Sequence, residues 1–285
     1  MGAMWESILE EAAAAAKQEP ALASVLHTNI LNHGRLEDSL SFVLAEKLGG
    51  PAVSALTLRS EFDAVFRADP TIGEAVRADL RAVVSRDPAT RGYSQPLLSF
   101  KGFHALQTYR IAHYYWEHGR EPIALFLQSR VSEVFGVDIH PAARIGRGIM
   151  FDHATSIVIG ETAVIDDDVS LLHEVTLGGT GKETGDRHPK IRRGVMIGAG
   201  SKILGNVVVG EGAKVGAGSV VLEDVPPHST VVGVPARAAG KPAERVPAYA
   251  MDQRIVVVTT RKNAPRMPAA AQDVPGAAPP ADEPC

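Results

Sequence analysis

Three groups of polar side chains between residues 138 and 190 of this 285-residue chain have the types and spacing to carry chemistry. The first is the pair Asp152-His153, because a histidine can take up and return a proton near neutral pH as a general base. The second is Asp138, a carboxylate that could fix the tautomer of such an imidazole. Structural roles explain both equally simply: a solvated corner histidine, and an aspartate that satisfies backbone groups where a helix ends.

The third group lies in a ten-residue polar segment, 181–190, which reads GKETGDRHPK. Arg187 could hold a carboxylate through two parallel hydrogen bonds, and His188 could donate a further one. Binding groups are often found on a polar loop that leaves a rigid scaffold, although a mobile surface loop would have the same composition. These side chains predict general-base chemistry on a substrate that bears a carboxylate.

The scaffold that must position these groups is a six-residue repeat from Ile145 to Pro226. Glycine recurs three places after the apolar position of the repeat, and the 181–190 segment interrupts the series. The apolar positions are Ile145, Phe151, Ile157, Ala163, Val169, Val175, Ile191, Ile197, Ile203, Val209, Val215 and Val221. Apolar hexads with small residues at a fixed offset are typical of a parallel β-helix.

Three hexads would close one triangular coil of about 18 residues, with coils stacked at about 4.8 Å. The repeat then predicts four coils, 145–162, 163–180, 191–208 and 209–226. Counting one coil onward from Asp138 places it over Ser156, three residues from His153. The Pro- and Gly-containing segment after Val225 is expected to close the open end of the stack.

The first half of the chain predicts helices, so the fold class is α+β with segregated parts. The expected helices are 5–18, 21–32, 37–48, 52–67, 71–84, 97–118 and 121–135. The expected organisation is a helical domain over 1–136, a β-helix over 137–240 and a flexible tail over 241–285. The tail prediction depends on its proline and alanine content, which cannot form a core.

Composition excludes several classes of function. The net charge of -4 and the pI near 6.2 give no basic surface for nucleic acid. No apolar run is long enough for a membrane span, and the acidic, alanine-rich start does not resemble a signal peptide. The only cysteine is Cys285, so no disulfide forms within the chain, which fits a reducing compartment and a cytoplasmic location.

Five segments, 137–143, 148–155, 175–182, 185–191 and 233–237, resemble the serine O-acetyltransferases. They read VDIHPAA, GIMFDHAT, VTLGGTGK, GDRHPKI and GVPAR. The resemblance covers about residues 5–245, including the helical half. It implies a left-handed β-helix and transfer of acetyl from acetyl-CoA to the L-serine hydroxyl, without a metal. This reaction begins cysteine biosynthesis, and the family implies feedback inhibition by L-cysteine.

The resemblance also implies roles for individual residues. His153 matches the catalytic base and Asp138 its partner, while Asp87, Asp152, Arg187 and His188 match the serine-binding residues. Arg187 would take the substrate carboxylate, and the two aspartates its ammonium group. The acetyl-CoA groove would run near Gly179, Thr180, Ala199, Lys214 and Ala217, where small side chains let the pantetheine arm approach and Lys214 meets a phosphate.

The resemblance also implies an oligomeric state and partners, and other functions remain possible from the residues. The family implies a homotrimer with active sites between neighbours, and a hexamer built as a dimer of trimers through the helical halves. A complex with O-acetylserine sulfhydrylase is doubtful, because the chain ends in Cys285 where many relatives end in isoleucine. The alternatives are a hexapeptide acyltransferase for homoserine or a sugar, a zinc site using His140, His153, His173 or His188, and a non-catalytic scaffold.

Overall fold

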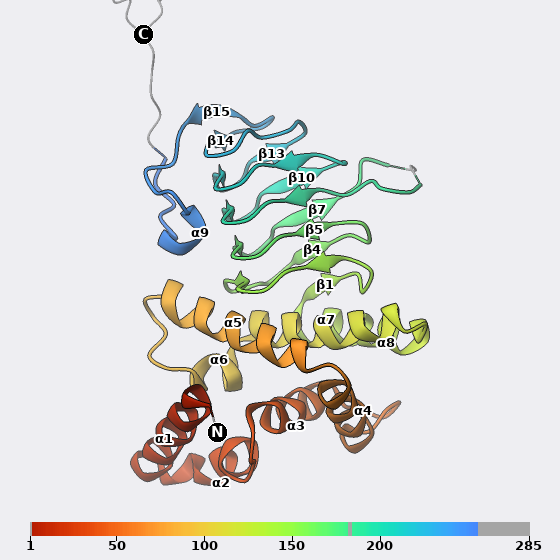
Figure 1. Cartoon of the computed structure of the whole chain (residues 1–285), viewed down its shortest axis with the longest axis vertical. Coiled ribbons are helices and arrows are strands. Elements are labelled where there is room, and N and C mark those ends of the chain that lie inside the picture. The colour runs from red at the N-terminus through yellow and green to blue at the C-terminus, as the bar shows by residue number, and fades with distance from the viewer. Residues whose placement is uncertain (1, 182–183, 256–285) are drawn as a thin grey trace, which may run out of the picture.

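The computed structural model describes residues 2–181 and 184–255 and has two parts, a helical half and a stack of parallel strands (Figure 1). In Figure 1 the helices lie below the strands, and the long helices α7 and α8 run beneath the first strand, β1. The predicted order, helices followed by a parallel β-helix, is confirmed. Within the two described ranges, no helix is both long and apolar enough to cross a membrane.

The helical half agrees with the predicted segments except at two places: the helix expected over 21–32 is divided into three short helical turns, and the helix expected over 97–118 is broken. Its elements are α1 (Ala3–Gln18), the 3₁₀ turn η1 (Pro20–Leu22), α2 (Ala23–Leu26), the π turn η2 (His27–Leu31), α3 (Leu36–Leu48), α4 (Ala55–Ala68), α5 (Pro70–Arg86), α6 (Ser94–Ser99), α7 (Lys101–Glu117) and α8 (Glu121–Phe135). The single helix expected over 97–118 is wrong, because Phe100 has an extended backbone and separates α6 from α7.

The break at Phe100 has a packing reason. It sets Gly102, in the first turn of α7, against the corner that follows Phe151. A Cβ on Gly102 would overlap the carbonyl oxygen of Phe151 and lie 2.9 Å from the Cβ of Ala154. A continuous helix would carry other side chains into this contact. The break therefore seats the start of α7 directly on the corner that holds His153.

The strand region is a three-sided prism. Its strands are β1 (Val137–Ile139), β2 (Arg144–Ile145), β3 (Met150–Phe151), β4 (Ile157–Ile159), β5 (Val164–Ile165), β6 (Ser170–Leu171), β7 (Thr176–Gly178), β8 (Lys190–Ile191), β9 (Met196–Ile197), β10 (Lys202–Leu204), β11 (Val208–Val209), β12 (Lys214–Val215), β13 (Val220–Val221), β14 (Thr230–Val232) and β15 (Arg237–Gly240). Sheet 1 has the order β1-β4-β7-β10-β13, sheet 2 β11-β8-β5-β2, and sheet 3 β15-β14-β12-β9-β6-β3.

Three edges separate the three sheets and are named here by the sheets they join. Edge 3–1 holds the turns from sheet 3 to sheet 1, edge 1–2 those from sheet 1 to sheet 2, and edge 2–3 those from sheet 2 to sheet 3. Because the strands pair in parallel register, equivalent turns of successive coils stack on one another along each edge.

The register corrects one prediction about the first coil. Val137 pairs with Ile157 and Asp138 with Val158, so this coil has 20 residues and Asp138 does not lie over Ser156. The next coil has the expected 18 residues, since Val158 pairs with Thr176. The two additional residues are accommodated in the turn between β3 and β4, which contains Asp152 and His153.

The interior of the prism is formed by the apolar positions of the repeat. Eleven of the twelve predicted positions are buried, and only Ile145 is half-buried. Each buried Val, Ile or Leu side chain contributes roughly 1.5–3 kcal/mol of transfer free energy. Glycine at the turns serves close packing: Gly148 has φ +71°, and a Cβ there would lie 2.5 Å from Asp168 Oδ1.

A buried polar cluster joins the helical half to the prism. Asp79 of α5 is fully buried and accepts hydrogen bonds from Arg110 Nη2 at 2.7 Å and from Gln107 at 3.0 Å, both on α7. Its second oxygen accepts from the Ile149 N–H at 2.9 Å. Burial raises the pKa of Asp79, and the Arg110 guanidinium opposes that effect. Losing one partner of such a cluster leaves a buried charge uncompensated, so α5 and α7 are fixed firmly on the first coil.

The far end of the stack is closed by a reversed strand. β14 continues sheet 3 in parallel with β12, whereas β15 pairs with β14 antiparallel. Ala236 N–H donates to the Val220 carbonyl at 2.8 Å and covers the last strand of sheet 1. The segment after Val225 therefore closes the open end, as predicted.

Residues 241–255 differ from the predicted flexible tail. They include α9 (Pro247–Ala250), whose Ala248 is fully buried and whose carbonyl accepts a hydrogen bond from Ser170 Oγ at 2.9 Å. α9 lies beside α5 (Figure 1). A proline at its first position and a small alanine let this short helix pack closely. The remainder of the predicted tail, 256–285, lies outside the described residues.

Candidate active site

Asp87, Asp152 and His153 line one cavity on edge 3–1. The cavity has a volume of about 610 Å³ and lies between the ends of α5 and α6, the start of α7 and the turn after β3. The His153 side chain is 75% exposed, and its Nε2 lies 3.8 Å from Asp152 Oδ1. Asp87 ends α5 and accepts hydrogen bonds from Ala89 N–H at 2.8 Å and Thr90 Oγ1 at 2.7 Å. An exposed imidazole in a cavity that two carboxylates also line suits proton transfer and recognition of an ammonium group.

The turn that carries His153 has an unusual backbone. His153, Ala154 and Ser156 all have φ near +60°, a region that residues other than glycine seldom adopt. The turn is held by the buried Ala154 side chain and by the Ser156 N–H, which donates to the Gly136 carbonyl at 2.7 Å. Backbone strain of this kind gathers at functional sites, where surrounding packing maintains it.

Two neighbours of His153 were not identified as members of this site from the sequence. His173, in the next turn of the same edge, has its ring 5.7 Å from that of His153 in an edge-on arrangement. Lys101 lines the same cavity and donates to Thr155 Oγ1 at 2.5 Å. An 18-residue count cannot place His173 one turn from His153, because the first coil is longer. Lys101 comes from the helical half, and its sequence gives no sign of this position.

Arg187 and His188 form a second group, on edge 1–2. Arg187 Nη2 donates to Glu161 Oε2 at 2.7 Å, and this guanidinium lowers the pKa of Glu161. The Thr162 N–H points at His188 Nδ1 at 3.2 Å, so the neutral ring carries its proton on Nε2 and can donate there. Burial, followed by the Arg187 charge, lowers the pKa of His188. Glu161 was not predicted, because a lone glutamate at a turn has no distinguishing pattern.

Asp138 lies apart from both groups in a single chain. It is on β1, in sheet 1, and its Oδ1 accepts a hydrogen bond from Gln128 Nε2 of α8 at 2.7 Å. It lines a different cavity from His153, together with residues of α8. The sequence-based argument that Asp138 reaches His153 by stacking within one chain is therefore not supported by the register.

Four of the five predicted acetyl-CoA residues divide between the same two edges, and the fifth, Lys214, lies on β12 of sheet 3. Ala199 and Ala217 occupy successive turns of edge 3–1, where the Gly218 N–H donates to the Ala199 carbonyl at 2.7 Å. Gly179 and Thr180 follow β7 on edge 1–2. Lys214 is 3% exposed, and its Nζ donates to the Arg254 carbonyl at 2.8 Å. Lys214 can meet a phosphate only after the segment at Arg254 moves.

Comparison with family models gives two matches. Residues 4–108 match the N-terminal domain of serine acetyltransferases, and residues 188–223 match the six-repeat hexapeptide segment of bacterial transferases. The first lies within the helical half and the second within the prism.

Individual relatives match over most of the chain. A serine acetyltransferase from Salmonella typhimurium is 59% identical over 250 residues, which is 88% of this chain and 92% of the relative. A crystal structure of serine acetyltransferase from Brucella abortus in complex with coenzyme A superposes with a TM-score of 0.83 at 53% identity, covering 85% of this chain and 96% of the other. A serine acetyltransferase in complex with cysteine has a TM-score of 0.87 at 53% identity, covering 89% and 98% of the two chains.

Proposed function

This chain belongs to the serine acetyltransferase family, and we propose that its active site forms between neighbouring subunits from residues that a single subunit holds apart. The enzyme transfers an acetyl group from acetyl-CoA to the hydroxyl of serine. The alternative acceptors, homoserine and sugars, are not favoured by these comparisons.

One observation supports the shared site. Asp87, Asp152 and His153 are on edge 3–1, whereas Arg187 and His188 are on edge 1–2, with sheet 1 between the two edges. A zwitterionic amino acid needs partners for its ammonium and its carboxylate within a few ångströms. Threefold packing of prisms would set edge 3–1 of one subunit against edge 1–2 of the next, and so complete three equivalent sites.

In this arrangement the substrate is held at both ends. Arg187 of the neighbouring subunit receives the serine carboxylate as a two-bond pair, and the Nε2–H of His188 donates to the same end. Asp87 and Asp152 accept hydrogen bonds from the ammonium group. Glu161, which holds Arg187 at 2.7 Å, orients the guanidinium in the free enzyme and must share it with the substrate.

The serine hydroxyl then lies next to His153, which removes its proton as the oxygen forms a bond to the thioester carbon. The tetrahedral intermediate breaks its C–S bond, and the imidazolium returns the proton to the CoA sulfur. Asp138 lies on β1, at the level of the first coil. We assign Asp138 of the neighbouring subunit as the partner of His153, since within one subunit it pairs with Gln128.

The acetyl-CoA groove is proposed to follow the same subunit boundary. Ala199 and Ala217 would line it from edge 3–1, and Gly179 and Thr180 from edge 1–2 of the neighbour. Small side chains on both walls let an extended pantetheine arm lie against the backbone. Lys214 would join the groove only when its bond to Arg254 is broken.

Further expectations concern regulation, assembly and location. L-cysteine should compete with serine, because it presents the same carboxylate and ammonium to Arg187, Asp87 and Asp152, and a cysteine complex is known in the family. The helical halves would join two trimers into a hexamer. The proposed location is the cytoplasm. The doubtful complex with O-acetylserine sulfhydrylase depends on Cys285, which is outside the described residues.

A complementation experiment tests the shared site. His153→Ala and Arg187→Ala subunits are each expected to be inactive alone. When the two are unfolded together and refolded as mixed trimers, a site with both native residues arises wherever an Arg187→Ala subunit presents its His153 to a His153→Ala neighbour. Random mixing gives such a site at about one boundary in four, so about a quarter of wild-type activity should return. No recovery, with mixed trimers verified by native mass spectrometry, would place both residues in one subunit.

A further inference from the structure

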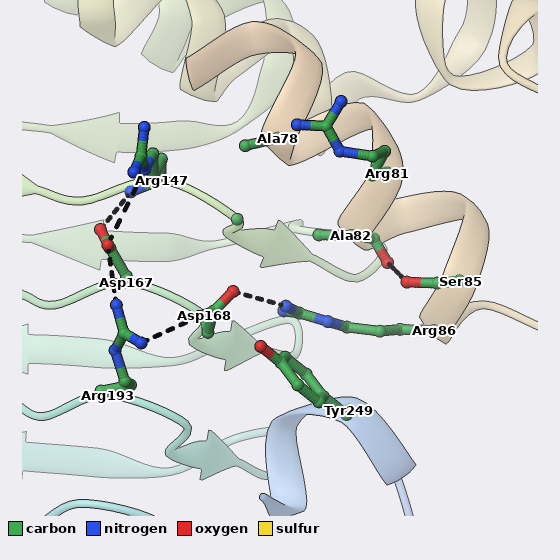
Figure 2. Close-up of a pocket in the computed structure, with 11 residues that line it drawn as sticks. Ala78, Arg81, Ala82, Ser85, Arg86, Arg147, Asp167, Asp168, Arg193 and Tyr249 are labelled. Atoms are coloured by element: carbon green, nitrogen blue, oxygen red, sulfur yellow. Dashed lines mark hydrogen bonds and ion pairs between the residues drawn. The ribbon is translucent and has the colours of Figure 1, made fainter. Parts of the chain in front are cut away.

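A cavity on edge 2–3, the edge that the proposed active site does not use, is lined by four arginines. Its volume is about 470 Å³, and its walls are one face of α5, the turns of three successive coils and Tyr249 of α9. Arg81 and Arg86 enter from α5, while Arg147 and Arg193 enter from the coils (Figure 2). The hollow exists because Ala78 and Ala82, one helical turn apart on α5, present only methyl groups to it.

The arginines exceed the carboxylates that face them. Asp167 and Asp168 are the acidic residues that line this cavity, which leaves a formal charge of +2. Both aspartates are already engaged. Asp167 accepts from Arg193 Nη2 at 3.1 Å and from the Arg147 N–H at 2.9 Å. Asp168 lies 3.5 Å from Arg86 Nη2 and 3.9 Å from Arg193 Nη1.

Among the described residues, two guanidinium groups of this cavity remain available for a ligand. Arg81 makes no ion pair or side-chain hydrogen bond with any residue in the described ranges, and it is exposed. Arg147 is 61% exposed, and its nearest carboxylate oxygens, on Asp167 and Glu74, are both 3.9 Å away, beyond hydrogen-bond distance. Figure 2 shows these two side chains on opposite sides of the upper part of the cavity.

Arg86 adds a buried positive charge at the base of the cavity. Its side chain is 3% exposed, and its guanidinium lies against the face of the Tyr249 ring, 4.8 Å from the ring centroid. Its Nε has no hydrogen-bond partner in the part of the chain that the structure describes. Burial lowers the pKa of Arg86, which means that the surroundings compensate its charge incompletely. An anion in the cavity would relieve this imbalance.

We propose that this cavity binds a small phosphate-bearing molecule, with Arg81 and Arg147 as its principal contacts. Guanidinium groups match phosphate oxygens through paired hydrogen bonds, and two of them facing each other suit a ligand with at least two negative charges. The cavity falls in the size range of small-molecule sites and is larger than a single phosphate needs. Its alanine and tyrosine wall can receive the non-phosphate part.

The test is calorimetric titration of the intact protein with pyrophosphate at constant ionic strength. One site per subunit is expected. Because a charge-assisted hydrogen bond contributes about 1.5–3 kcal/mol, Arg81→Gln and Arg147→Gln should each weaken binding roughly 10- to 100-fold. Arg67→Gln removes one charge from the exposed end of α4 and serves as the matched control, with unchanged binding. Acetyl transfer by the two cavity variants should stay within about twofold of wild type, because neither residue is in the active site.

Three results would overturn the proposal. The first is that pyrophosphate does not bind to the wild-type protein. The second is that the wild type and both cavity variants bind it equally well, and the third is that saturating CoA displaces it. The last would assign the signal to the cosubstrate groove. None of these results bears on the acetyltransferase assignment, because the titration does not depend on turnover. Conversely, a wild-type protein without acetyltransferase activity would not change the binding result.

Discussion

Gly160 gives the sharpest prediction about the site, because its missing side chain makes room for His188. A Cβ at Gly160 would overlap the Cδ2 and Nε2 atoms of the His188 ring, and Cε1 would lie at only 2.8 Å. Ordinary carbon contacts are about 3.5–4.0 Å. In a Gly160→Ala variant the ring must therefore retreat by about 1 Å or more. The hydrogen bond between Thr162 Oγ1 and His188 Nδ1, now 2.9 Å, would be broken or badly strained.

The expected cost follows from this displacement. If His188 helps to hold the serine, a shift of about 1 Å should lower kcat/KM for serine by about 100-fold. The coil itself should remain intact, since Gly160 does not have the positive φ that would exclude alanine. The effect should appear mainly as a higher KM for serine, with the KM for acetyl-CoA changed little.

Gly178 provides a matched control one coil further along the same edge. There a Cβ would approach the methyl group Cδ2 of Leu204 at 3.1 Å, which a small side-chain rotation can accommodate. Both variants would be assayed by CoA release with serine varied, next to thermal unfolding curves. If Gly160→Ala and Gly178→Ala have the same kcat/KM within about threefold, His188 is not a substrate contact.

Four other outcomes are expected. His153→Ala should lower turnover roughly 10²–10⁴-fold without changing the oligomeric mass, and a variant within threefold of wild type would remove His153 from the mechanism. L-cysteine should raise the apparent KM for serine at constant kcat, and full activity at millimolar cysteine would contradict this. Light scattering should find no 30.2 kDa monomer at working concentration. Burial lowers the pKa of His104 to about 4 from its usual 6.5. Because the unfolded chain therefore binds this proton at a higher pH than the folded chain, the free energy of unfolding should fall as the pH drops from 6.5 towards 4. His104 should account for about 2 kcal/mol of the loss at pH 5 in urea titrations, and His104→Gln should remove that part of the loss.

The hexad pattern predicted the fold well but could not locate the catalytic turn precisely. Side chains two apart on a strand face the same side of a sheet. Ile157 and Ile159 are therefore both buried in the prism, and so are Val175 and Leu177. Between β4 and β7 a frame displaced by two residues is also apolar and buried, at Ile159, Ile165, Leu171 and Leu177. This coincidence hid the longer first coil and placed Asp138 over Ser156 instead of Val158.

The sequence predicted which residues are candidates for the site, but it did not predict how they are arranged in space. Asp87 gave only a helix-stop signal, and its approach to Asp152 depends on how α5 packs against the first coil. The separation of Arg187 from His153 depends on which edge each turn occupies, a property of the whole prism. Long-range packing also decides the break at Phe100. Gly102 lies inside the first turn of α7, so this glycine does not end a helix there but serves the contact with Phe151 and Ala154.

The reversed direction of β15 determines how long the stack can become. A column of parallel strands exposes unpaired backbone groups at both ends, and each end can recruit a further strand from another molecule, as in amyloid growth. Here the helices beneath β1 block one end, and the antiparallel β15 offers a mismatched direction at the other. Both ends of each prism are therefore blocked against the addition of further strands. Truncation before Arg237 should uncover β14 and allow molecules to join end to end into filaments.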